Sequence, residues 1–344
     1  MTAGDIPELA RVDLRHRRDI RIMLLAKHAL ADGRPHPEDG NHAVYHQELR
    51  QTLERLGFPL VAANEYDALY QRPNADFVIP LLNRGGFQNS EMLAPLLLEK
   101  YGLPFLGARA ILRGLADDKQ AAKLVAKEAG IPTIAGQVYR RGGPVRPPEF
   151  GAERMIVKPN ASSASWGLKI CRYWADAEPQ IRKLQDDGHD VIVERWMPDS
   201  DIGVGVVGGA DGRPVVLPPL RYCLPDGIEY RSYAGKRGLP GEDAVADDHR
   251  PITAPTLRRE LEEMSLRLAD EFWPFDYGRF EFRHDRRTGA LHFMEVNLSC
   301  NLWSRKTIAK AAGLVGIDYP RLIEGIIGHS LARQTDIVPE RIAA

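Results

Sequence analysis

Two short segments late in the chain carry the residues best suited to chemistry. Arg279 and Glu281 are two residues apart in one apolar, strand-like segment, and Glu295 and Asn297 are two apart in another. Residues two apart project from the same face of a β-strand. Because residues 284–290 between the segments are turn-like, we expect the strands to pair antiparallel and to bring the four side chains together.

This set of side chains favours a metal site. Carboxylate and amide oxygens suit Mg²⁺, which completes its coordination with water and phosphate oxygens, so Glu281, Glu295 and Asn297 are candidate ligands. Arg279 could stabilise a transferring phosphoryl group or a developing oxyanion. The alternative is an exposed, charged sheet face.

A second candidate site follows the apolar segment that ends at Lys158. The next residues include Ser162, Ser163, Ser165 and Gly167. A loop of small residues can bring backbone N–H groups close to phosphate oxygens, and a lysine adds a point charge. The pattern therefore indicates either a phosphate-binding loop or a plain polar hairpin.

A third candidate lies where another apolar segment ends at Glu194. Trp196 and Met197 follow, and Asp201 comes shortly afterwards. Adenine needs an apolar slot with a few polar contacts, and ribose needs an acceptor for its hydroxyl groups. These residues could supply both, or could form an ordinary strand-to-loop corner.

Two other patterns are interpreted as structural. Residues 203–208 spell GxGxxG, but the glycines alternate with valines and a turn follows, so we expect a β-hairpin that continues into 214–217 rather than a dinucleotide site. His42 and His46 are four apart at the start of an expected helix. Without a third ligand of clear spacing, we interpret them as surface or capping residues.

The remaining patterns predict an α/β architecture. Strands and helices alternate early in the chain, which favours a parallel sheet, and strands dominate later. The expected strands are 20–25, 77–82, 155–157, 168–171, 191–193, 202–207, 278–282 and 291–296, and the expected helices are 42–57, 91–101, 117–130, 175–187, 257–272 and 303–312.

Composition excludes several classes of protein. The 344 residues carry 46 Lys plus Arg against 47 Asp plus Glu, a formal charge of -1, which argues against a nucleic-acid binder. We find no apolar run long enough to span a membrane and no secretory signal at the start, so we expect a cytoplasmic protein. Cys171, Cys223 and Cys300 are too widely spaced to indicate a disulfide framework or a cysteine zinc site.

Taken in order, these clusters resemble the ATP-grasp superfamily, and within it the D-alanine–D-alanine ligases. The likeness spans residues 20–331. Its best-matched pieces are 83–86, 101–107, 118–119, 157–159, 194–196, 278–281 and 295–297. The resemblance implies an α/β (α+β) fold with a parallel N-terminal α/β domain at 1–113 and two antiparallel-sheet domains at 114–197 and 198–344, which hold ATP between them. It also implies small-molecule substrates and a homodimer.

The resemblance assigns a role to each matched residue. Lys119 and Lys158 would contact the nucleotide phosphates, and the loop at 162–167 would cover them. Lys236 would be the γ-phosphate lysine of a mobile flap. The other implied contacts are adenine with Glu194, Trp196 and Met197, ribose with Asp201, two Mg²⁺ ions (or Mn²⁺) with Glu281, Glu295 and Asn297, and the acyl phosphate with Arg279.

The implied reaction is ATP-dependent joining of a carboxylate and an amine through an acyl phosphate. From its residue type, Asn301 is a candidate side-chain donor to the oxyanion of the tetrahedral intermediate. The substrate residues depart from the ligase pattern, which favours amino-acid-like substrates other than D-alanine. Alternatives are an intramolecular lactam-forming cyclase, a D-alanine–D-alanine ligase and a catalytically silent nucleotide-binding protein. The candidate substrate residues are Glu38, Arg84, Gly85, Ser304, Arg305 and Lys306, of which Arg305 and Lys306 either bind an anion or are merely solvated.

Overall fold

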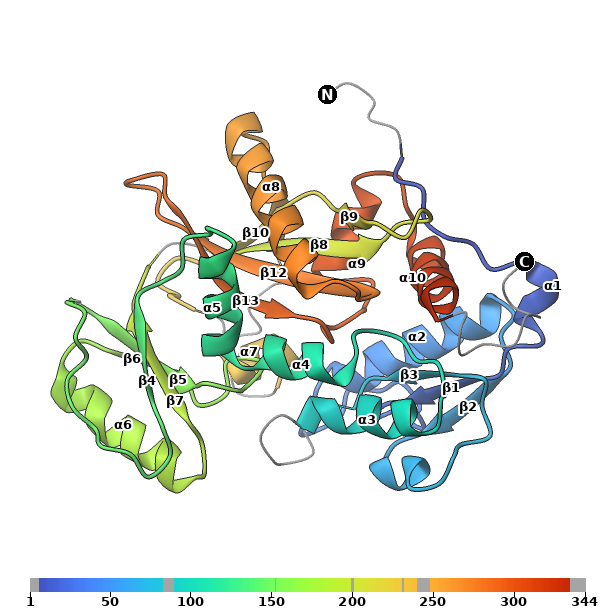
Figure 1. The fold of residues 1–344 in the computed structure, drawn as a ribbon, viewed down its shortest axis with the longest axis horizontal. Coiled ribbons are helices and arrows are strands. Elements are labelled where there is room, and N and C mark those ends of the chain that lie inside the picture. Colours follow the sequence, from blue (N-terminus) through green and yellow to red (C-terminus); the bar gives the residue numbers. More distant parts are fainter. Residues whose placement is uncertain are drawn as a thin grey trace.

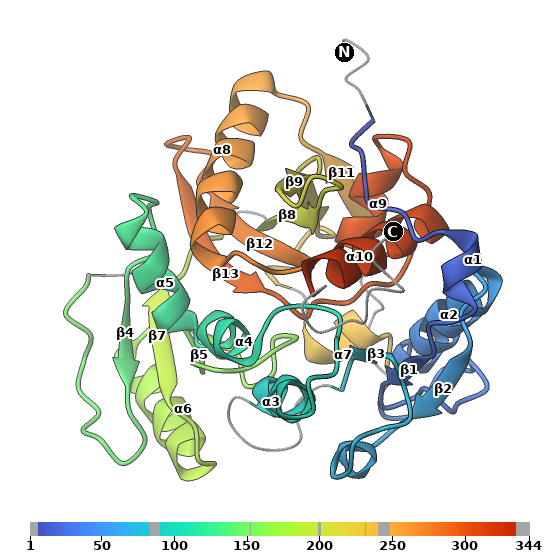
Figure 2. The same cartoon turned by 45° about the vertical axis from the view of Figure 1, so that its right-hand side comes forward.

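The computed structural model describes residues 6–82, 90–151, 153–198, 201–230, 232–239 and 248–334. Within them the strands form three sheets. Figure 1 shows these sheets as separate layers, and Figure 2 shows the short helix α7 (Tyr233–Arg237) among them.

The first sheet is parallel, as the alternation of strands and helices predicts. Its order is β2-β1-β3, and helices α2 and α3 cover its two faces (Figure 1). Along β1, Ile22 and Leu24 pack toward α2, whereas Met23 and Leu25 pack toward α3. The elements here are α1 (Leu14–Arg17), β1 (Ile22–Leu25), α2 (His42–Arg55), β2 (Leu60–Ala63), η1 (Tyr66–Leu69), β3 (Phe77–Pro80), η2 (Ser90–Met92) and α3 (Leu93–Lys100).

The second sheet is antiparallel, with order β4-β7-β5-β6, and α6 packs on one face. Two helices precede it and lead from the first sheet. The elements are α4 (Ala110–Asp117), α5 (Lys119–Glu128), β4 (Gly136–Tyr139), β5 (Met155–Pro159), β6 (Lys169–Cys171), α6 (Trp174–Asp186) and β7 (Val191–Arg195).

The third sheet is also antiparallel and follows the order β11-β10-β8-β12-β13, with β9 paired to β8. The β8–β9 pair confirms that the GxGxxG segment is a hairpin. Helix α8 and part of α5 cover one face, and α9 and α10 cover the other. The elements are β8 (Asp201–Gly208), β9 (Pro214–Val216), β10 (Leu220–Cys223), α7, β11 (Asp248–Pro251), α8 (Pro255–Phe272), β12 (Tyr277–His284), β13 (Leu291–Asn297), α9 (Thr307–Gly313) and α10 (Tyr319–Arg333).

Each sheet falls inside one of the three predicted domain ranges, although the boundaries themselves remain a prediction. One expected helix begins later than predicted: α9 starts at Thr307 rather than at residue 303, because Lys306 has an extended backbone. The first core cluster joins residues of the parallel sheet to residues of α9 and α10, so the beginning and the end of the chain share one core.

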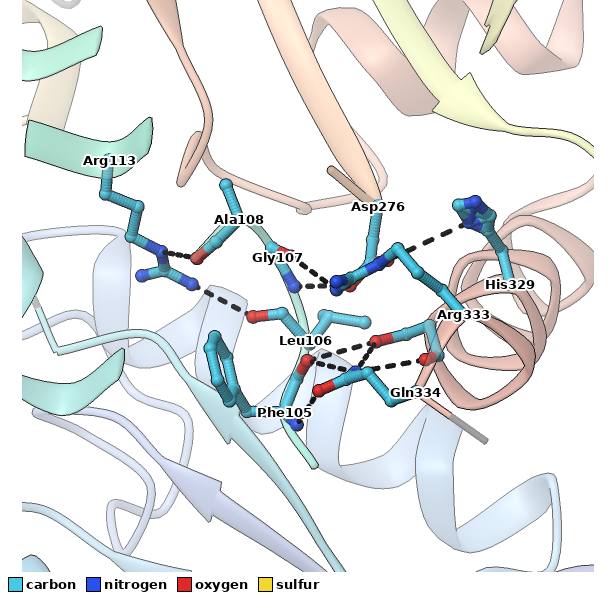
Figure 3. A network of polar contacts seen from close by, with 10 residues as sticks. Phe105, Leu106, Gly107, Ala108, Arg113, Asp276, His329, Arg333 and Gln334 are labelled. Atoms are coloured by element: carbon cyan, nitrogen blue, oxygen red, sulfur yellow. Dashed lines mark hydrogen bonds and ion pairs between the residues drawn. The ribbon is translucent and has the colours of Figure 1, made fainter. Parts of the chain in front are cut away.

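A buried polar network fixes the start of β12 (Figure 3). Asp276, which is 0% exposed, accepts hydrogen bonds from Gly107 N at 2.6 Å and from Arg333 Nε at 3.0 Å. Gln334 Nε2 donates to Phe105 O at 2.9 Å. Because a buried carboxylate needs such partners, the network holds β12 against α10 and the segment that leaves the first sheet.

Candidate active site

One cavity is lined by residues from all three parts of the fold. His42 comes from α2, which packs on the first sheet, Lys158 comes from β5 of the second sheet, and Arg279 and Glu295 come from β12 and β13 of the third. Most of the predicted site residues line it. They are Lys119, Lys158, Ser162, Ser163, Ser165, Trp196, Asp201, Lys236, Arg279, Glu281, Glu295, Asn297, Asn301 and Lys306.

The acidic residues of β12 and β13 face each other as the spacing predicts. Glu281 is directly opposite Glu295, and Arg279 is opposite Asn297, with a register irregularity just after Glu281. Arg279 Nε donates to Glu281 Oε1 at 2.6 Å. Like charges directly opposite in a sheet repel each other, so the pair of Glu281 and Glu295 needs positive charge nearby.

Basic side chains supply part of that charge. Lys119 Nζ lies 3.6 Å from Glu295 Oε2. Burial raises the pKa of Glu295, but Lys119, Lys158 and other cations outweigh it and hold the pKa at about 2. Burial lowers the pKa of Arg279, but Glu281 beside it raises that pKa well above its ordinary value. Carboxylate and amide oxygens are hard donors, so Glu281, Glu295 and Asn297 form a set that fits a divalent cation.

The loop that follows β5 has an unusual backbone conformation and is held by lysines. Ala164 and Ser165 have φ of 55° and 63°, which is the left-handed region that non-glycine residues rarely adopt. Backbone strain of this kind concentrates at functional sites. Lys119 Nζ donates to Ser162 O at 2.6 Å, and Lys236 Nζ donates to Ser165 Oγ at 2.7 Å, so two lysines hold the loop.

The strain at Ala164 gives a testable prediction. Ala164→Gly should raise the free energy of unfolding by about 1 kcal/mol, because glycine adopts a positive φ without steric cost. Ala175→Gly, in helix α6, is the matched control and should lower it by a few tenths to about 1 kcal/mol. Urea denaturation measures both values, and a destabilised Ala164→Gly protein would contradict the argument.

Trp196 lies at the end of the cavity where the resemblance predicts the nucleoside. Arg283 packs over the Trp196 ring at 4.9 Å, pairs with Asp201 Oδ1 at 2.6 Å and donates to Met197 O at 2.9 Å. Met197 itself does not line the cavity. Arg283 was missed from the sequence, although it is two residues beyond Glu281 and therefore projects from the same strand face.

Glu194 does not line the cavity, where the resemblance would have it contact adenine. Its side chain is 1% exposed and lies between two lysines, with Lys158 Nζ at 2.7 Å and Lys123 Nζ in close contact. Burial lowers the pKa of Lys158 to about 8. The sequence signal for Lys123 was its position four residues after Lys119, which puts both on one face of α5.

Helix α7, which the resemblance predicts to be a flap, contacts the loop that follows β1. Arg237 Nη1 donates to Asp39 in a buried ion pair, and Asn41 N donates to Arg237 O at 3.0 Å. An added Cβ on Gly40 would lie 1.9 Å from Arg237 O, so only glycine fits there. Asp39 thus makes the flap contact, whereas its neighbour Glu38 is exposed and does not line the cavity.

Loss of this ion pair should destabilise the protein. Asp39→Asn should lower the free energy of unfolding by about 2–4 kcal/mol at pH 7, because the Arg237 guanidinium would stay buried without a counter-charge. It should also raise KM for ATP, since Arg237 neighbours Lys236. Asp32→Asn, an exposed acid of the same loop, is the control and should change neither quantity.

The pH dependence of this contribution follows from the pKa of Asp39. Burial raises that pKa, but Lys27, His28 and Arg237 lower it well below the ordinary value of 3.8. The folded-state pKa is depressed, so the stabilisation is present above about pH 4 and is lost as the pH falls further. Urea midpoints at pH 7 and pH 3 should therefore differ more for the native protein than for Asp39→Asn.

The interpretation of the two histidines was wrong for His46 and incomplete for His42. His46 is 2% exposed, and its Nδ1 accepts from His28 N at 3.2 Å. His42 lines the cavity, and the N-cap position of α2 is Asn41. Both were interpreted as surface or capping residues because a sequence does not show what packs on the first turn of a helix.

The other predicted residues lie around the cavity or outside the described chain. Asn301 lines it, and its Oδ1 accepts from Trp303 N at 2.7 Å, which leaves the amide NH₂ available to donate. Gly167, Ser304 and Arg305 do not line it. Arg84 and Gly85 lie outside the described residues.

Comparison with known proteins agrees with this geometry. Residues 152–328, just over half of the chain, match the family model described as D-ala D-ala ligase C-terminus. A D-alanine–D-alanine ligase of Aquifex aeolicus is 26% identical over 231 residues, which cover 67% of this chain and 75% of that protein. One of Marinomonas sp. is 26% identical over 288 residues, which cover 80% and 86%.

Solved structures show the same fold. The crystal structure of D-alanine–D-alanine ligase from Bacillus anthracis complexed with ATP aligns with a TM-score of 0.72 and 18% identity, covering 92% of this chain and 99% of that one. The fold and the site together define the ATP-grasp class. The chain belongs to the D-ala D-ala ligase C-terminus family.

Family membership confirms several predictions. The ATP-grasp fold is confirmed, as is the class of enzyme, an ATP-dependent ligase that forms C–N bonds. ATP and a divalent metal are what this family requires, and its substrates are small molecules. None of the helices in the described part of the chain has both the length and the apolar character needed to cross a membrane.

Proposed function

We propose that this enzyme joins a carboxylate to an amine through an acyl phosphate. A carboxylate oxygen attacks the γ-phosphorus of ATP, and the bond to the β–γ bridging oxygen breaks to give ADP and the acyl phosphate. The amine then attacks the acyl carbon, phosphate leaves, and the amine loses a proton. The products are an amide, ADP and phosphate.

The observation that carries this proposal is the cluster of Arg279, Glu281, Glu295 and Asn297 with basic side chains around it. The carboxylate and the triphosphate are both anions, so transfer requires their repulsion to be neutralised. Two Mg²⁺ ions bound by Glu281, Glu295 and Asn297 would supply Lewis-acid stabilisation of phosphoryl charge.

The protein's own residues perform the other tasks in this proposal. Lys119, Lys158 and Lys236 bind the phosphates, and the loop at 162–167 covers them and excludes water. Arg279 stabilises charge on the transferring phosphoryl group, and Asn301 donates to the oxyanion. Trp196 and Asp201 hold the nucleoside.

For the substrates we propose amino-acid-like molecules other than D-alanine. Support comes from the lining of the cavity, which includes His42, Arg237, Lys306 and Asn301. Side chains of this kind can hydrogen-bond polar groups that the methyl side chain of alanine lacks. We also retain the homodimer as a prediction, since no contact in the described chain bears on it.

The experiment is a screen for ADP and phosphate release with pooled carboxylates and amines, followed by mass spectrometry of the product. A product with the mass of both substrates less one water supports the proposal. A product that has lost one water from a single substrate would indicate a cyclase, and D-alanyl-D-alanine would indicate the D-alanine ligase reaction. Nucleotide binding without ADP release under any pair would contradict a ligase.

A further inference from the structure

Three side chains of types that ligate metals meet outside the candidate active site, in the loop that joins β1 to α2. One ring nitrogen each of His28 and His36 and one carboxylate oxygen of Asp39 all lie within 4.8 Å of one another. His28 and Asp39 are buried, and His36 is half-buried. None of the three lines the cavity, so this cluster is separate from the carboxylates of β12 and β13.

The backbone of the loop holds two of the three residues in place. His36 N donates to Gly40 O at 2.9 Å, and Gly40 N donates to His36 O at 2.7 Å, which closes the turn at 36–40. Pro35 and Pro37 restrict the backbone on either side of His36. His36 and Asp39 therefore lie on one restrained turn, and such pre-positioning lowers the entropic cost of binding an ion.

The separations are close to those of a tetrahedral metal site. Bonds of about 2.0–2.2 Å place neighbouring ligand atoms of a Zn²⁺ ion about 3.3–3.6 Å apart. His28 Nε2 lies 2.9 Å from Asp39 Oδ2, and the centroids of the His28 and His36 rings are 4.7 Å apart. The His36 Nδ1 atom accepts two long hydrogen bonds, from Glu38 N at 3.2 Å and from Asp39 N at 3.3 Å. Long bonds of this kind are weak, so the His36 ring can turn toward an ion.

The Asp39 carboxylate already attracts positive charge. Lys27 and His28 contact its Oδ2 atom, and Arg237 contacts Oδ1. The Lys27 side chain is 58% exposed, so it can return to water at little cost when an ion takes its place at Oδ2. Arg237 can stay at Oδ1, because ligating carboxylates at metal sites are commonly held by a further hydrogen-bond donor.

The ligand types select the ion. Two imidazoles and one carboxylate suit Zn²⁺ and similar transition metals, whereas Mg²⁺ prefers oxygen ligands. A further imidazole supports the site: the rings of His46 and His28 stack at 5.8 Å, and His28 N donates to His46 Nδ1 at 3.2 Å. Three protein ligands leave one tetrahedral position for water.

We propose that His28, His36 and Asp39 bind one Zn²⁺ ion, or a transition metal of the same ligand preference, between β1 and α2. The site is separate from the proposed magnesium site, and its role is structural. Because Asp39 also contacts Arg237, the bound ion fastens this loop to helix α7.

Cobalt(II) is the probe, since a four-coordinate site gives this ion a strong visible absorption band. The native full-length protein, freed of metal with EDTA, is titrated with Co²⁺ while excess Mg²⁺ and a nonhydrolysable ATP analogue occupy the candidate active site. We expect one equivalent of Co²⁺ to bind with a visible band that Zn²⁺ abolishes and Mg²⁺ does not. The measurement requires no turnover, so it is independent of the ligase function.

Three variants assign the band to the cluster. His36→Gln should weaken Co²⁺ binding at least about tenfold, because it removes a ligand. Lys27→Gln should strengthen binding about fivefold, because it removes the ammonium group that competes for Asp39. His16→Gln, on helix α1, is the matched control and should bind Co²⁺ as the native protein does.

Folding is checked by urea denaturation of the metal-free proteins, in which each variant should unfold in one cooperative transition. The absence of a visible band in the native protein, or an unchanged Co²⁺ affinity in a folded His36→Gln variant, would overturn the proposal. An unchanged affinity in Lys27→Gln would also contradict it, because the ion would then not lie at Asp39 Oδ2.

Discussion

Glu295→Gln should reduce kcat for ADP release by about a thousandfold, because a lost ligand removes several kcal/mol of charge stabilisation at the phosphoryl group. Glutamine keeps the size of the side chain but not its charge. The low pKa of Glu295, about 2, means that the native group is fully ionised at neutral pH, so the substitution changes the charge at every working pH.

Nucleotide binding separates this effect from misfolding. The variant should still bind ATP, since Lys158 and Trp196 remain, and it should still unfold in one cooperative transition. Glu263→Gln, an exposed acid on α8, is the control and should keep full turnover. Unchanged kcat in Glu295→Gln would exclude this residue from the metal site.

Arg279→Lys should lower kcat by about a hundredfold with little change in KM for ATP. In the native protein the Arg279 guanidinium contacts Glu281 Oε1 through both Nε and Nη2, at 2.6 and 2.5 Å. A lysine ammonium cannot reproduce this planar, two-nitrogen contact. A donor lost from the developing charge costs about 10²–10³ in kcat.

Arg283→Lys, on the same face of β12, is the contrasting variant. Its contacts are with Asp201, Met197 and Trp196, at the proposed nucleoside end. It should therefore raise KM for ATP and leave kcat nearly unchanged. If Arg279→Lys altered KM while Arg283→Lys altered kcat, the assigned orientation of ATP in the cavity would be reversed.

Local patterns predicted the elements of the site well. The two-residue spacing in β12 and β13 and the turn between them were enough to place Glu281 opposite Glu295, because strand geometry and a short connection leave few alternatives. The family resemblance then identified Lys119 and Lys158 as candidate ligands of the nucleotide phosphates. Lys119 and Lys158 both line the cavity.

Contacts between distant segments could not be predicted. Arg237 and Asp39 are 198 residues apart, and nothing in either local sequence indicates the partner. The same applies to Glu194, whose strand position was expected but whose side chain turns toward Lys123 and Lys158. Helix α10 was also not predicted: its buried residues surround much of the helix, so no clear polar face marks it.

The most direct test of the central claim is anomalous diffraction from crystals grown with Mn²⁺ and a nonhydrolysable ATP analogue. The account predicts manganese peaks within bonding distance of Glu281, Glu295 and Asn297, with the triphosphate between them and Lys119 and Lys158. Peaks elsewhere, or a triphosphate remote from the paired carboxylates of β12 and β13, would contradict it.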